Sequence, residues 1–71
     1  MTRFQTLLQG SGFTGSEAAD FLNVKHATLR SWAGNRRNCP DDIIRAFLPV
    51  AKANCEQLYS EICRIENDLE N

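Results

Sequence analysis

Active sites and metal centres are usually built from residues that are scarce in this sequence. Its 71 residues include one histidine and three widely spaced cysteines, without a Cys-x-x-Cys pair. A zinc knuckle needs closer pairs and a disulfide framework usually has an even number, so neither is expected. Cys55 and Cys63 fit helical positions as small hydrophobes, whereas the neighbours of Cys39 do not decide whether it is an exposed, redox-sensitive thiol.

Glycine-rich phosphate loops and long apolar runs are missing as well. Without such a loop, and with little volume for a pocket, the chain is not expected to be an enzyme or to bind a metal or small-molecule cofactor. No apolar run approaches the roughly 18 residues that cross a membrane. The first residues lack the apolar core of a signal peptide. These features predict one small cytoplasmic domain with no membrane partner.

Charge is present in both signs but is unevenly distributed along the chain, whose formal net charge is −1. From residue 56 onward, five acids stand against one cation. Such asymmetry favours a basic surface for a polyanion, although two solvated surfaces that differ by chance remain the alternative. The stretch from residue 25 to 37 contains no acid and four cations: Lys25, Arg30, Arg36 and Arg37.

The apolar residues repeat with helical spacing, and no segment predicts a strand. A short amphipathic helix is expected over residues 3–9. Thr14 and Glu17 then form a capping-box pattern, in which the side chain of each residue accepts a hydrogen bond from the amide of the other. This pattern predicts that a second helix begins at about residue 15.

The second helix is expected to end at Asn23, because asparagine tolerates the left-handed conformation that turns the chain sharply. Val24 would be buried inside this turn. A third helix would begin near residue 25, with Leu29 and Trp32 facing inward.

Two helices joined by a three-residue turn make this segment similar to the helix-turn-helix of the Cro/C1-type (XRE-like) repressors of phages and bacteria. The resemblance covers about residues 4–48, and the motif itself lies at about 15–34. Small Ala19 lets the helices approach, and Asn23 stands where the family usually has glycine. The chain also resembles small phage autorepressors, including anti-CRISPR-associated regulators.

The resemblance implies an all-α, five-helix, lambda-repressor-like domain that binds double-stranded DNA. In this family the second helix of the motif lies in the major groove, with its N-terminal residues at the base edges. The base-contacting residues so implied are Lys25, His26, Ala27, Arg30 and Ser31. The implied phosphate-contacting residues are Thr14, Gly15, Ser16, Asn35, Arg36, Arg37 and Asn38.

The last part of the chain predicts a dimer. Pro49 is expected to break the fourth helix, so that residues 50–68 form one long helix. Apolar residues there alternate spacings of four and three, which is typical of a coiled-coil seam. We therefore divide the chain into a DNA-binding part, 1–49, and a dimerisation helix, 50–71, of one compact unit. The expected dimer interface comprises Ala51, Cys55, Leu58, Tyr59, Ile62, Ile65 and Leu69.

A helix folded entirely on its own domain is the alternative to that interface. The expected function is a homodimeric transcription repressor that binds an inverted-repeat operator, with its own promoter as one candidate target. An antitoxin, or another module whose long C-terminal helix engages a partner protein, is the alternative function. For either function we expect the protein to be located in the cytoplasm of a bacterial host cell.

Overall fold

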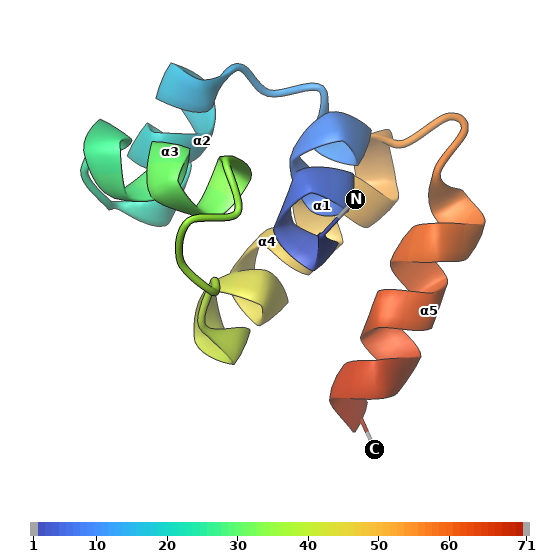
Figure 1. Cartoon of the computed structure of the whole chain (residues 1–71). Coiled ribbons are helices and arrows are strands. Elements are labelled where there is room, and N and C mark those ends of the chain that lie inside the picture. The colour runs from blue at the N-terminus through green and yellow to red at the C-terminus, as the bar shows by residue number, and fades with distance from the viewer. Residues whose placement is uncertain (1, 71) are drawn as a thin grey trace.

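A computed structural model of the chain describes residues 2–70, and over those residues it contains helices but no strand (Figure 1). The all-α prediction is therefore confirmed. Within the same residues, no helix has the length and apolar character needed to cross a membrane. The five helices are α1 (Arg3–Ser11), α2 (Gly15–Leu22), α3 (His26–Ala33), α4 (Asp41–Asn54) and α5 (Tyr59–Glu70).

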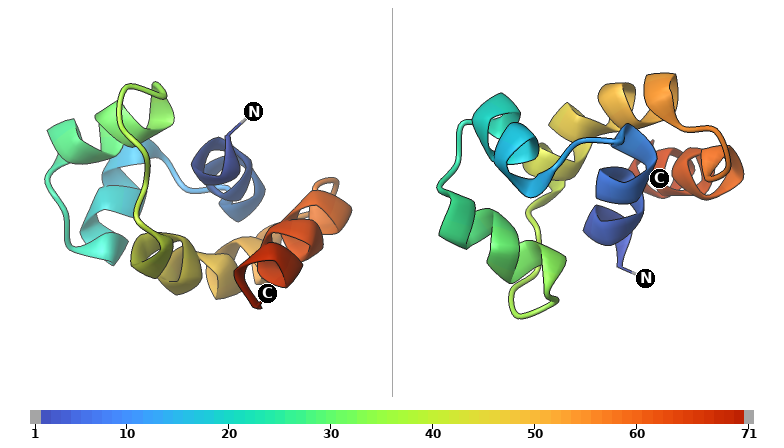
Figure 2. Two further views of the ribbon diagram at one scale, coloured as in Figure 1. Left: turned by 60° about the horizontal axis from the view of Figure 1, so that its bottom comes forward. Right: turned by 90° about the horizontal axis from the view of Figure 1, so that it is seen from above.

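The helices are arranged with α2 and α3 at one end of the molecule and α5 at the other. Helices α1 and α4 lie between them, as the views in Figures 1 and 2 agree. The chain thereby separates its third helix from its last one. A surface on α3 and a surface on α5 can each be occupied without blocking the other.

Side-chain caps start two of the helices. The predicted capping box is confirmed at α2, where the Thr14 hydroxyl accepts from the Glu17 amide at 3.2 Å and the Glu17 carboxylate accepts from the Thr14 amide at 3.0 Å. A second capping box that was not predicted joins Thr2 and Gln5 at the start of α1. Each box satisfies two amides that a helix start leaves without partners.

The turn between α2 and α3 depends on a left-handed residue. Asn23 has φ 57° and ψ 44°, as predicted, and its amide donates to the Asp20 carbonyl at 3.3 Å. The Val24 amide donates to Ala19 at 3.1 Å, and the Val24 side chain is half-buried rather than fully enclosed. These bonds fix the direction in which α3 leaves α2.

The core joins all five helices through buried apolar side chains. Phe4 of α1 is buried there, with its ring 5.7 Å from Trp32 in an edge-to-face arrangement and 5.9 Å from Phe47. Leu29 and Trp32 point inward as predicted, so α3 has one buried side and one free side. The buried apolar residues are Phe4, Leu7, Ala18, Ala19, Leu29, Trp32, Ile44, Phe47, Leu48, Ala51, Ile62 and Ile65.

The prediction of one long last helix is wrong. Helix α4 continues through Pro49 to Asn54, the chain turns over residues 55–58, and α5 begins only at Tyr59. A proline inside a helix costs about 3 kcal/mol. The helix continues because the residues after the proline pack on the core: Ala51 is fully buried and Val50 is partly buried against it. The predicted boundary between residues 49 and 50 therefore falls inside a helix.

The predicted dimer seam is largely closed within the chain itself. Ala51 and Ile62 are fully buried and Ile65 is nearly so, because α5 folds back onto α4 and α1. The approach to α1 is close, since a Cβ on Gly10 would lie only 2.7 Å from Cδ1 of Ile62. For these three seam residues the dimer-interface prediction is wrong, and the alternative of a helix folded on its own domain holds. The reason is that heptad spacing describes an apolar stripe and does not specify what covers it.

Candidate nucleic-acid interface

The free side of α3 carries the residues that sequence reasoning assigned to base contact. Lys25, His26, Ala27 and Arg30 are exposed, and Ser31 is half-buried. Of these residues, His26, Ala27, Arg30 and Ser31 lie within the helix itself. With an advance of about 100° per residue, they span about 140° around the helix axis. They therefore form one continuous side of α3, opposite the buried residues.

Ser31 is the least available of these residues. Its hydroxyl donates to the Ala27 carbonyl one turn earlier, at 3.2 Å. Its carbonyl accepts from the amides of Arg36 at 2.9 Å and Arg37 at 3.3 Å. A hydroxyl that already donates within its own helix can only accept from a further group without rearranging.

The start of α2 lies against the start of α3. A Cβ on Gly15 would lie 3.0 Å from Nε2 of His26, so the imidazole rests on the backbone where α2 begins. This contact brings a predicted base-contacting residue next to the predicted phosphate-contacting segment. The amides of Gly15 and Ser16 make no hydrogen bond within the described chain and point out of the helix end. Such amides are suited to bind an anion, although the Glu17 carboxylate already offsets part of the positive helix end.

The loop after α3 presents side chains rather than amides. Asn35 has φ 60°, a left-handed conformation, and its amide donates to the Trp32 carbonyl at 3.2 Å. The next two amides also bond to α3 carbonyls, so the backbone of the loop is folded onto the helix end. The predicted phosphate-contacting side chains of this loop are all exposed: Asn35, Arg36, Arg37 and Asn38.

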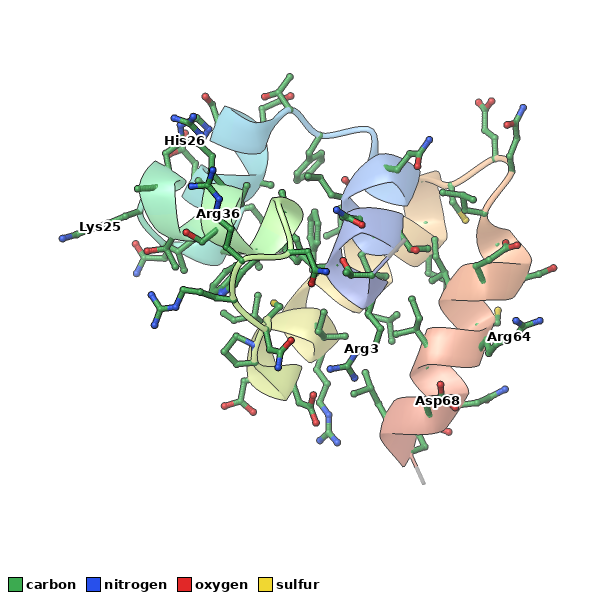
Figure 3. All side chains as sticks on the ribbon, viewed as in Figure 1. Arg3, Lys25, His26, Arg36, Arg64 and Asp68 are labelled. Atoms are coloured by element: carbon green, nitrogen blue, oxygen red, sulfur yellow. The ribbon has the colours of Figure 1, made fainter. Side chains whose placement is uncertain are left out.

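A shallow depression joins α3 to this loop. It has a volume of about 410 Å³, and its lining includes Ala27, Arg30 and Arg36. Figure 3 shows Lys25, His26 and Arg36 at the end of the molecule formed by α2 and α3, and Arg64 and Asp68 at the opposite end, on α5. We call the exposed set Lys25, His26, Arg30, Arg36 and Arg37 the basic surface.

The charges of the basic surface have no partners in the part of the chain that the structure describes. The ion pairs there join Arg3 to Asp41 and Lys52 to Glu66, each at 2.9 Å, and Arg45 donates to the Leu69 carbonyl. No ion pair or side-chain hydrogen bond involves the four Lys and Arg residues of the basic surface. Cations without acidic partners are the ones that can compensate an external anion.

Gln5 is a positioning residue that sequence reasoning missed. Its Nε2 donates to the Ala33 carbonyl at the end of α3, while its Oε1 accepts from the Thr2 amide. Gln5 therefore fixes the last turn of α3 against α1. Its role in the first capping box could have been found from the Thr2-x-x-Gln5 spacing, but the bond to Ala33, 28 residues away, has no local signal.

Cys39 follows the basic loop and is not an exposed thiol. It is half-buried, and burial raises its pKa to about 11, with Arg3 acting against this shift and Asp41 adding to it. The thiol is therefore protonated at neutral pH. A protonated, half-buried thiol is a poor nucleophile, which argues against a redox-sensitive role at this position.

Helix α3, the start of α2 and the loop after α3 thus form a surface rich in donors and cations. A polyanion with regularly spaced charges is the ligand class that such a surface fits best. The fit of this surface to a polyanion rests on the positions and charges of its residues. No protein-family model matches this chain, and neither a curated protein nor a solved structure shows significant similarity to it.

Proposed function

We propose that this chain is a sequence-specific regulator of transcription that binds double-stranded DNA through a lambda-repressor-like helix-turn-helix domain. The observation that carries the proposal is the set of unpaired cations around the free side of one short helix. Helix α3 has eight residues, about 12 Å at a rise of about 1.5 Å each. Its diameter with side chains is about 10–12 Å, which fits the roughly 12 Å width of the major groove of B-DNA.

In this proposal α3 reads base edges. Arg30 can donate two hydrogen bonds to O6 and N7 of one guanine, and Lys25 or His26 can donate to guanine or to a phosphate. Ala27 offers a methyl group for contact with a thymine methyl. Each good base contact of this kind contributes about 1–3 kcal/mol of discrimination.

Phosphate contacts would hold both ends of the reading helix. The start of α2 touches the start of α3 through Gly15 and His26, and the loop with Arg36 and Arg37 follows the end of α3. Contacts at both ends fix the register and angle of a helix in the groove without specifying sequence. They also make the affinity dependent on salt.

The proposal includes a homodimeric repressor. Operators of helix-turn-helix repressors have two half-sites about 34–36 Å apart, and each half-site binds one copy of the chain. The monomer measures 28 × 23 × 19 Å, so two copies can occupy adjacent turns. Helix α5 lies at the end opposite α3 and leaves the basic surface free. Of the predicted interface, Tyr59 is 52% exposed, and Cys55, Leu58 and Leu69 are half-buried. A second copy would meet these residues.

The alternative function, an antitoxin or other protein-binding module, depended on a long C-terminal helix. The twelve-residue α5, which uses Ile62 and Ile65 for the core of its own chain, gives that alternative less support.

The test is selection of duplexes from a random pool, followed by fluorescence anisotropy with the best duplex and a scrambled one. Titrations at about 50 and about 200 mM salt should differ strongly in affinity, because phosphate contacts release counterions. The selected duplex should bind much more tightly than the scrambled one. Arg64→Ala is the matched control, since Arg64 is an exposed cation on α5. Equal binding to both duplexes, or an equal loss in Arg30→Ala and Arg64→Ala, would contradict the proposal.

A further inference from the structure

The only histidine of the chain, His26, has its imidazole against the first residue of α2. A Cβ on Gly15 would lie 3.0 Å from Nε2 of His26 and 3.8 Å from its Cδ2. His26 is the first residue of α3, and side chains tilt toward the N-terminus of their helix, so the ring extends past the end of α3. Glycine at position 15 leaves the space that the ring fills. Nε2 therefore lies at the start of α2, next to residues assigned to DNA phosphate.

The protonation of this ring decides what it can donate there. A neutral imidazole carries a hydrogen on one nitrogen only and leaves the other as an acceptor, whereas the imidazolium donates from both. The nearby amides of Gly15 and Ser16 make no hydrogen bond within the described chain. An anion that accepts from these amides is attracted by the imidazolium and repelled by a bare Nε2. Binding of such an anion therefore favours the protonated ring.

The charges around His26 act in both directions. Acids on α2 favour a positive ring, and the cations of the basic surface disfavour it. None of these groups forms an ion pair with the imidazole within the described residues, and Figure 3 shows Lys25 and Arg36 at the same end of the molecule as His26. A bound phosphate removes the opposition of the cations, because it compensates their charge. The groups concerned are Glu17 and Asp20 on α2, Lys25 before α3, Arg30 within it, and Arg36 and Arg37 on the loop.

We propose that His26 contacts a DNA phosphate at the start of α2 as an imidazolium, so that DNA binding takes up a proton from solvent. The phosphate site belongs to the proposed function, on which this inference rests; the role of His26 and the proton are new. In this role His26 adds affinity without discriminating between bases, because phosphates carry no sequence. DNA affinity falls as pH rises through about 5–8, the range in which histidine ordinarily loses its proton.

A single histidine makes this proton directly observable by NMR, because the imidazole C–H resonances belong to His26 alone. Their titration is followed for the free chain and for its complex with the selected duplex. The midpoint should be about one pH unit higher in the complex, which corresponds to an affinity change of up to about tenfold over the titration. A bound duplex with an unchanged or lower midpoint would overturn this inference alone. Failure of every duplex to bind would remove the proposed function as well.

Two adjacent exposed residues provide the matched variants. His26→Gln keeps a side-chain donor but cannot be charged, so its DNA affinity should be the same at about pH 6 and about pH 8. At the lower pH it should bind every duplex about tenfold more weakly than the unmodified chain, the effect of losing one hydrogen bond to a charged group. Lys25→Gln should weaken binding equally at both pH values, because lysine stays charged over this range. A pH dependence that persists in His26→Gln, or a loss confined to one base pair, would overturn the proposal.

The phosphate itself is located with duplexes in which one phosphate at a time is replaced by an uncharged methylphosphonate. One replacement in each half-site should abolish the pH dependence, and His26→Gln should have no further effect on the affinity for that duplex. If no replacement reduces the pH dependence, His26 does not contact a phosphate and the proposal fails.

Discussion

Replacing Ile62 with alanine should destabilise the monomer, because this side chain closes the core from α5. Ile62 is fully buried against the segment of α1 that contains Gly10. The substitution removes three carbon atoms, about 2.4 kcal/mol at about 0.8 kcal/mol per buried group. The cavity that remains adds to this loss, and such substitutions cost about 2–5 kcal/mol in all. A domain of this size has only about 4–10 kcal/mol of stability, from about 0.05–0.15 kcal/mol per residue.

Urea unfolding followed by circular dichroism measures this loss. Asn67→Ala is the control, since Asn67 is exposed on the same helix, and its effect should stay within about 0.5 kcal/mol. The loss caused by Ile62→Ala should be the same at low and high protein concentration, because Ile62 contacts its own chain. A loss that appears only at high concentration, or a value as small as that of Asn67→Ala, would mean that Ile62 faces a second copy.

Further predictions concern the turns, the loop and the buried thiol. Asn23→Ala should cost about 1–2 kcal/mol of unfolding free energy because Asn23 is left-handed, and Asn23→Gly should cost much less; equal losses would refute the role of φ. Thr14→Ala should cost about 0.5–2 kcal/mol by removing the cap of α2, whereas a neutral result in the same urea assay would refute it. Arg36→Gln and Arg37→Gln should each reduce the slope of log affinity against log salt by about 0.9; an unchanged slope would remove that residue from the phosphate contacts. Burial raises the pKa of Cys39 from 9.0 to about 11. Below pH 9 the thiol is protonated in both the folded and the unfolded chain. As the pH rises from 9 to 11 the thiol of the unfolded chain loses its proton first, so the stabilisation that this shift represents is lost over that interval. Peptide-resolved alkylation should accordingly show Cys39 reacting slowly until pH nears 11, and rapid reaction at pH 8 in the folded protein would contradict the shift.

The features that sequence predicted well are those that depend on neighbours within one helical turn. Thr14 and Glu17 cap each other, and Asn23 ends α2 through its own backbone conformation. The free side of α3 followed from the spacing of Leu29 and Trp32, because two inward residues three apart define the opposite side.

The features that sequence missed depend on distant parts of the chain. Pro49 predicts a helix break locally, but burial of its neighbours on α4 keeps the helix continuous. The stripe that contains Ile62 has the spacing of a dimer seam, yet α1 and α4 of the same chain cover it. In the candidate site, the contact of His26 with Gly15 and the bond from Gln5 to the end of α3 arise only when the helices pack.

In the proposed complex with DNA, α3 reads bases while the loop after it holds phosphates. The most direct measurement is anisotropy with a family of duplexes in which each base pair of the selected site is changed in turn. Arg30→Ala should lose about 1–3 kcal/mol of discrimination at one base pair and retain it elsewhere. Arg37→Gln should instead weaken every duplex equally, because phosphates carry no sequence. An unchanged base-pair profile in Arg30→Ala, or no preference for any duplex in the unmodified chain, would contradict the account.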